Sequence, residues 1–219
     1  MHKSIYLIIV CFPLIGVFGQ SHERGTFSFT LGYDAGVHGV AYNSEYNGNK
    51  LDQDTSAAGT RMGHLTASYN LFKFMSIGLD LRSGGYVEDP ENATANGNRV
   101  SMTGINLRFY PVNREKFAWY IGPSFGISRL EINRIYTFII SIPAKYRYSA
   151  GHFGLETGFN WYFAKNFGMN FALGYSGQNY RMYYYSLNNE EQDLTNFDNT
   201  LQTIGIHMNL GLSFRFGGR

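Results

Sequence analysis

The C-terminal segment of the chain alternates strictly between large apolar residues and small or polar residues. From Ile204 to Phe216 the apolar residues take every second position, and between them lie Gly205, His207, Asn209, Gly211, Ser213 and Arg215. A period of two is typical of a β-strand with one apolar and one polar face. The segment is longer than the roughly nine to eleven residues that cross a bilayer at a tilt, so it predicts a membrane-spanning strand.

The same alternation recurs along the chain and predicts about eight long strands. Their centres lie at residues 27–40, 61–69, 75–82, 105–109, 119–127, 153–161, 169–175 and 204–216. Short connections are expected near 70–73, 111–116 and 163–166, and long ones over 42–58, 84–98, 130–145 and 179–199. Short turns at one end and long loops at the other are typical of all-β, antiparallel up-and-down transmembrane barrels, with periplasmic turns and external loops.

The composition of the face opposite the large apolar residues indicates which side of each strand contacts lipid. This face consists mainly of Gly, Ser, Thr and Asn, while most Lys and Glu residues fall in the expected loops and turns. A water-soluble barrel would carry those charges on its outer face, so we expect the apolar face outward and the polar face inward. A periplasmic aromatic girdle is expected at the short-turn end, made by Tyr69, Phe109, Trp119, Trp161, Phe214 and Phe216.

The N-terminus has the features of a cleaved secretory signal peptide. A positive charge at Lys3 precedes an apolar stretch over 5–18, and the small residue Gly19 precedes the expected cleavage site. Residues 1–19 are therefore predicted to be removed. The single cysteine, Cys11, lies within the apolar stretch, so the mature chain is expected to have no disulfide and no thiolate metal site.

Composition agrees with one barrel domain. We expect a short lead over 20–24 and a barrel over 25–219. The chain contains 26 Gly, 17 Tyr and 18 Phe, and 16% of its residues are charged, against about 25% in a typical soluble domain. With a net charge of +2 and no basic cluster, nothing indicates nucleic acid as a partner.

Several charged residues fall on the face that is expected to point inward. They are Asp34, Asp80, Arg82, Arg108, Glu156, His207 and Arg215. A buried charge needs a partner, so we expect a polar network, with Glu156 paired to Arg108 or Arg82. Because an eight-strand interior is just wide enough for side chains, this network is expected to plug the lumen. The alternative is a gated pore or proton path.

Candidate catalytic and metal-binding residues are sparse. None of the expected strands carries a His and a Ser two positions apart, the pattern of a lipid deacylase. His64 and Thr66 have that spacing, but a secondary hydroxyl is a poor substitute. Loop acids such as Glu45, Asp52 and Asp54 lack the spacing of a calcium loop. We therefore expect no enzyme activity, no metal site and no cofactor.

The strand rhythm, the unequal connections and the terminal Leu210-Gly-Leu-Ser-Phe-Arg-Phe216 make the chain resemble a known family. It is similar to the small eight-stranded OmpA/OmpX-like outer-membrane β-barrels, grouped with porin-family β-barrel proteins of Bacteroidota, over about residues 25–216. The resemblance implies a bacterial outer-membrane location and recognition of the C-terminal strand by the barrel-assembly machinery. The chain departs from the family in the residues 217–219 that follow the terminal aromatic.

We therefore expect an outer-membrane protein with a structural or surface-interaction role and a plugged lumen. The alternatives are a narrow channel or transporter of small hydrophobic ligands and, third, a lipid A-modifying enzyme. Outer-membrane lipid and lipopolysaccharide are the expected partners, together with a surface partner that contacts loops 130–145 and 179–199. Those loops are unusually apolar over 130–142 and rich in tyrosine over 183–185.

Overall fold

The computed structural model describes residues 22–87, 97–137 and 141–217. The predicted signal peptide, 1–19, lies outside the described residues. The strands are β1 (Phe27–Tyr46), β2 (Asn49–Phe72), β3 (Met75–Val87), β4 (Asn98–Asn113), β5 (Phe117–Thr137), β6 (Ser141–Ala164), β7 (Phe167–Leu187), β8 (Glu190–Glu191) and β9 (Phe197–Phe216).

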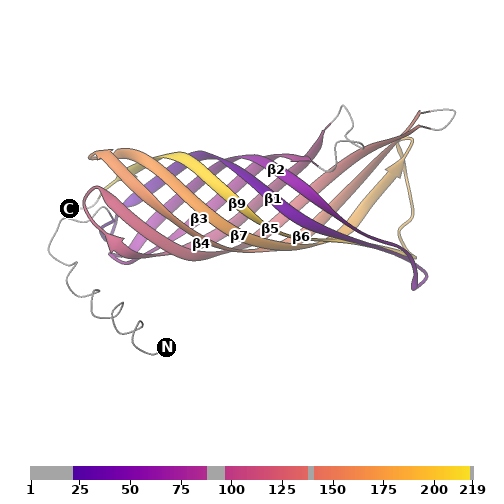
Figure 1. Cartoon of the computed structure of the whole chain (residues 1–219), viewed down its shortest axis with the longest axis horizontal. Coiled ribbons are helices and arrows are strands. Elements are labelled where there is room, and N and C mark those ends of the chain that lie inside the picture. The colour runs from indigo at the N-terminus through magenta and orange to yellow at the C-terminus, as the bar shows by residue number, and fades with distance from the viewer. Residues whose placement is uncertain (1–21, 88–96, 138–140, 218–219) are drawn as a thin grey trace.

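Eight of these strands close into a ring of antiparallel neighbours. The order is β6-β5-β4-β3-β2-β1-β9-β7, and pairing between β6 and β7 completes the ring, while the two-residue β8 lies beside β7. Figure 1 shows an elongated barrel of tilted strands, with the short turns and the C-terminus at one end and extended hairpins at the other. The predicted all-β up-and-down barrel of eight strands is confirmed. No helix among the described residues is long and apolar enough to span a membrane.

The apolar face of the strands points outward. Along β9, Ile206 is 67% exposed, while its neighbours Gly205 and His207 point inward and are buried. Exposed apolar residues extend along β5 from Phe117 to Ile127, and ten residues at about 3.3 Å each with a tilt of about 40° span about 25 Å. That height matches the hydrocarbon core of an outer membrane, so lipid covers this belt.

Aromatic side chains mark the short-turn end of the belt. Exposed rings there include Tyr69, Phe109, Trp119, Trp161 and Phe216. Phe214 is half-buried, because its ring packs 5.0 Å from the ring of Phe167. The structure thus places all six girdle residues on the outer wall near the periplasmic turns, where the amphipathic Tyr and Trp rings can meet the headgroup layer.

The prediction of long loops over 42–58, 130–145 and 179–199 is wrong, because most of these residues continue the neighbouring strands. β1 and β2 extend to a tight turn at Asn47 and Gly48, both with positive φ, and β5 and β6 stay paired up to Thr137 and Ser141. β7 likewise continues to Leu187. Beyond the membrane the inward-facing residues are apolar as well. The alternation of apolar and polar residues, by which the strands were predicted, therefore disappears there. Residues 88–96 and 138–140 of the expected loops lie outside the described residues.

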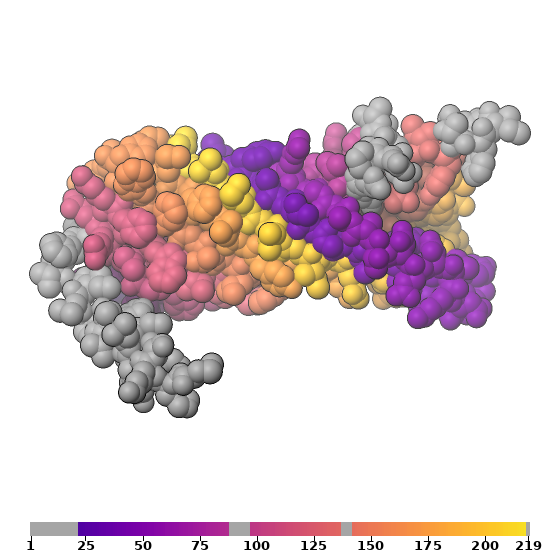
Figure 2. Space-filling view, viewed as in Figure 1, coloured from indigo at the N-terminus to yellow at the C-terminus, as the bar shows by residue number. Residues whose placement is uncertain are grey.

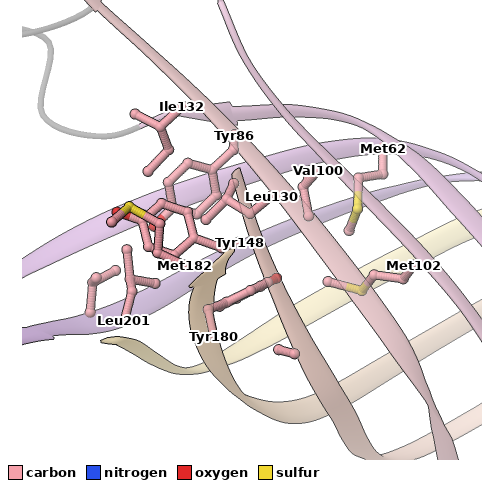
Figure 3. Packing of buried hydrophobic residues seen from close by; sticks show 13 residues of the cluster. Met62, Tyr86, Val100, Met102, Leu130, Ile132, Tyr148, Tyr180, Met182 and Leu201 are labelled. Carbon is pink, nitrogen blue, oxygen red and sulfur yellow. The ribbon is translucent and has the colours of Figure 1, made fainter. Parts of the chain in front are cut away.

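The interior has two parts of different chemistry. Polar residues fill the middle and the periplasmic half, and an apolar cluster fills the end near the long hairpins (Figure 3). This outer cluster consists of Val40, Ala58, Met62, Tyr86, Val100, Met102, Leu130, Ile132, Tyr148, Ala150, Tyr180, Met182 and Leu201. A space-filling view shows the β1–β2 hairpin, in purple, projecting beyond the ring at that end (Figure 2).

Candidate functional site

The guanidinium of Arg82 lies at the centre of the buried charge cluster in the lumen. Its Nη1 lies 2.8 Å from Oδ2 of Asp34, and its Nη2 lies 2.8 Å from Oδ2 of Asp80. Nη2 also lies 3.2 Å from Oε2 of Glu156. One cation on β3 therefore binds carboxylates from β1, β3 and β6, which lie on different sides of the ring.

Glu156 joins this cation to a second one. Its Oε1 lies 3.1 Å from Nη2 of Arg108 and accepts a hydrogen bond of 2.9 Å from the hydroxyl of Tyr120. The guanidinium of Arg108 also lies over the ring of Tyr120, 4.3 Å from its centroid. Nε2 of His207 lies 3.9 Å from Oε2 of Glu156. These contacts connect β4, β5, β6 and β9.

Asp80 connects the cluster to β2. Its Oδ1 lies 2.7 Å from Nε2 of His64 and accepts a hydrogen bond of 3.2 Å from Thr66. The other ring nitrogen of His64 contacts the side-chain amide of Asn209 on β9. With neutral histidines, the three carboxylates and two guanidinium groups carry a formal charge of −1.

Glycines on the inward face make room for these long side chains. At Gly158 an added Cβ would lie 2.8 Å from Cζ of Tyr120, and at Gly122 it would overlap the backbone of Leu107. The free space lined by Arg82, Arg108 and their neighbours is about 10 Å³. A single water needs about 10 to 15 Å³, so the cluster leaves little room for solvent.

The structure brings together most of the sequence-predicted lumen residues. Asp80, Arg82, Arg108 and Glu156 are in contact, and His207 lies at their edge. The expectation that Arg215 joins this network is wrong. Near the end of β9 it donates to the backbone oxygen of Lys165 and lies over the ring of Tyr162, since its strand position places it at the periplasmic rim. No sequence pattern pointed to Tyr120, because only its inward parity linked it to the charges.

The periplasmic end of the lumen is filled by the residue that precedes the barrel. His22 is 1% exposed, and its ring stacks on Tyr110 with centroids 4.3 Å apart. The side-chain amide of Asn113 accepts from the backbone N–H of His22 and donates to its carbonyl oxygen. Burial, together with the charges of Arg215 and Arg108, lowers the pKa of His22 to about 3, so its imidazole is neutral at neutral pH.

The external mouth is wider and lined by tyrosines and acids. A cavity of about 350 Å³ lies above Val40 and Leu201 of the apolar cluster. Its rim includes Asp52 and Asp54 of β2, and across from them the hydroxyl of Tyr136 forms a hydrogen bond of 2.7 Å with that of Tyr146. The sequence placed both acids in a loop; the structure instead places them on the inner side of an extended strand.

Comparisons with known proteins agree with this fold. No sequence-family model matches the chain, and no curated protein does either. OprG from Pseudomonas aeruginosa, an outer membrane protein, is similar over 90% of this chain and 98% of its own, with 14% identity and a TM-score of 0.55. AlkL, an outer membrane protein solved in lipid bilayers, is similar over 90% of this chain and 92% of its own, with 12% identity and a TM-score of 0.51.

The fold and the outward apolar face together define the class of protein. The chain is an outer-membrane β-barrel of eight strands, like the structures it resembles. At these identities the likeness establishes the fold, and the role has to be argued from this chain's own residues.

Proposed function

We propose that this barrel is a closed structural and surface-interaction protein of the outer membrane. The observation that carries this proposal is the cluster around Arg82, which ties together side chains from opposite sides of the ring and leaves about 10 Å³ of free space. Any ion that crossed the lumen would have to displace paired, buried charges, at a cost of several kcal/mol.

The uneven outer rim supports a role at the cell surface. The β1–β2 and β5–β6 hairpins rise beyond the ring, whereas β7 and β9 stay paired only up to Arg181 and Thr200 (Figure 1). Long hairpins held by paired backbones present side chains at low entropic cost, which favours binding of a partner. The surface partner expected at 130–145 and 179–199 would therefore contact mainly paired strands rather than irregular loops.

We propose that the protein has no enzyme activity. Within the lumen, Oγ of Ser124 lies 3.4 Å from Nε2 of His152, which resembles a nucleophile and its base. The other nitrogen of that ring, however, contacts the amide of Gln178 at 2.9 Å, and an amide cannot stabilise an imidazolium as a carboxylate does. All three side chains are also buried inside the barrel.

A second candidate function is transport of a small hydrophobic ligand. The apolar cluster behind the mouth favours it, since side chains such as Met62, Met102 and Met182 can repack around an apolar molecule. The charge cluster blocks an axial exit, so such a ligand would have to leave sideways through the wall.

Uptake by intact cells separates the two candidates. A strain that lacks the protein should take up small polar solutes and small hydrocarbons at the wild-type rate if the barrel is closed. Uptake of hydrocarbons that falls severalfold in the deletion strain and recovers with the intact gene would favour the transporter instead.

A further inference from the structure

A band of basic residues lies on the outer wall of the barrel near its external end. Strand pairing places Arg99 of β4 opposite Glu131 of β5, Glu131 opposite Arg147 of β6, and Arg147 opposite Tyr184 of β7. Residues that are directly opposite on one face of a sheet have Cβ atoms about 5 Å apart. These side chains therefore form one continuous row across four strands.

The row lies just above the lipid-facing belt. On β5 the run of exposed apolar residues that begins at Phe117 ends at Ile127, and the next two outward positions are Arg129 and Glu131; the next exposed apolar residue, Ile135, lies beyond them. Two and four residues along a tilted strand correspond to about 5 and 10 Å along the membrane normal. The headgroup layer extends roughly 5 to 8 Å beyond the hydrocarbon core on each side, so the row lies at the outer edge of that layer, within reach of long basic side chains.

The row borders a groove that carries an excess of positive charge. The groove has a volume of about 510 Å³, and its charged lining residues are Arg99, Glu131, Arg134, Lys145 and Arg147. Arg134 also lines the cavity at the external mouth, so on the outer wall three basic side chains lie beside one carboxylate.

The single carboxylate already has partners. Glu131 accepts a hydrogen bond of 2.9 Å from Nε of Arg147 and lies 3.7 Å from Nζ of Lys145. Although burial opposes its ionisation, these contacts hold the pKa of Glu131 below its usual value. Arg99 forms no ion pair with any residue that the structure describes. Among those residues, Arg147 donates a hydrogen bond only from Nε, and its guanidinium lies over the ring of Tyr184, 4.9 Å from the centroid. Donors therefore remain for an anion.

We propose that this groove binds a phosphate group of outer-leaflet lipopolysaccharide. A phosphate beside Arg99, Lys145 and Arg147 would neutralise the excess charge through charge-assisted hydrogen bonds. The acyl chains of the same molecule would lie along the apolar wall directly below, from Ile127 toward Phe125 and Phe153. A soluble anion could use the donors but not that wall, which favours a lipid. The inference depends on the barrel's place in the membrane and does not depend on whether the lumen is closed.

Native mass spectrometry of the refolded full-length barrel tests this site. The probes are bisphosphorylated lipid A, the same lipid without its phosphates, and inorganic pyrophosphate as a competitor. The test variant is Arg99→Gln with Lys145→Gln, which keeps the pair between Arg147 and Glu131. The matched control, Arg114→Gln with Lys116→Gln, removes the same two charges from an exposed periplasmic turn.

The expected result is loss of lipid A affinity by about 25-fold in the test variant, and no change in the control. That size follows from roughly fivefold for each basic residue near an anionic surface. Should the double variant fail to give a folded, heat-modifiable band, Arg99→Gln alone should still weaken binding about fivefold. Equal binding by the dephosphorylated lipid or by the variant would overturn the proposal. Displacement by equimolar pyrophosphate would overturn the lipid assignment.

Discussion

Glu156 shows how single residues hold this barrel together. One carboxylate on β6 meets Arg82 from β3, Arg108 from β4 and the hydroxyl of Tyr120 from β5. A sequence alternation can place each of these residues inside the ring, and shared inward parity was enough to expect a pair between Glu156 and an arginine. It could not show that both arginines bind the same carboxylate, because that depends on side-chain length and on how the ring closes.

Glu156→Gln should destabilise the folded barrel strongly. The variant replaces one acceptor oxygen with an N–H donor and leaves two buried guanidinium groups facing it. Breaking a buried ion pair costs about 3 to 5 kcal/mol, and the remaining amide oxygen should keep the loss near the lower value. Urea unfolding in lipid vesicles, followed by tryptophan fluorescence, measures the change. Glu190→Gln, on the exposed strand β8, is the control and should be neutral; equal stability of both variants would contradict the paired carboxylate.

Gly158 tests how tightly the interior is packed. An alanine there would place its Cβ 2.8 Å from Cζ of Tyr120 and 2.8 Å from Cβ of Ala172, so we expect Gly158→Ala to lower the free energy of unfolding by about 1 to 3 kcal/mol. At Gly151 an added Cβ meets nothing within 4 Å, and Gly151→Ala should cost little. Paired unfolding curves of the two variants make the comparison, and a harmless Gly158→Ala would mean that the lumen has room to spare.

At the scale of whole strands, the sequence predicted the membrane half better than the outer half. Within the membrane, outward residues meet lipid and inward residues meet polar side chains, which creates a strict period of two, as in β9. The number of strands and the direction of their side chains could therefore be predicted from the sequence. Beyond it, inward residues such as Leu130, Ile132 and Tyr148 are apolar as well, and the contrast is lost. The basic row on the outer wall was missed for a related reason, since Arg99 and Arg147 are neighbours through strand pairing and far apart in sequence.

Phe216→Ala tests where the closing strand ends. Phe216 pairs in register with Phe27, and its ring lies 6.2 Å from that of Phe29, so truncation removes an interfacial contact at the seam between β9 and β1. We expect less folded barrel in the membrane, measured as a weaker heat-modifiable band on unboiled gels. Deletion of residues 217–219 should leave the band unchanged. If the deletion abolished the band while Phe216→Ala left it intact, the closing strand would have to extend beyond Phe216.

At the scale of the whole molecule, three different sets of side chains lie in the lumen, and a cavity of about 350 Å³ opens at its external end. His22 and its tyrosines fill the periplasmic end, the cluster around Arg82 fills the middle, and the apolar cluster fills the outer part. Each set uses contacts between strands that lie apart in the ring, so the proposed closure of the lumen and the stability of the barrel would depend on the same residues. The outer wall and the hairpins remain available for lipid and for partners.

The current through a planar lipid bilayer tests the closed lumen most directly. Refolded wild-type protein, with insertion verified by its heat-modifiable band, should add no steady current at moderate voltage in 1 M salt. The reason is that Arg82, Arg108 and Glu156 occupy the middle of the lumen and leave about 10 Å³ between them. Regular current steps from the wild-type protein, with the same conductance in preparation after preparation, would contradict the closed barrel.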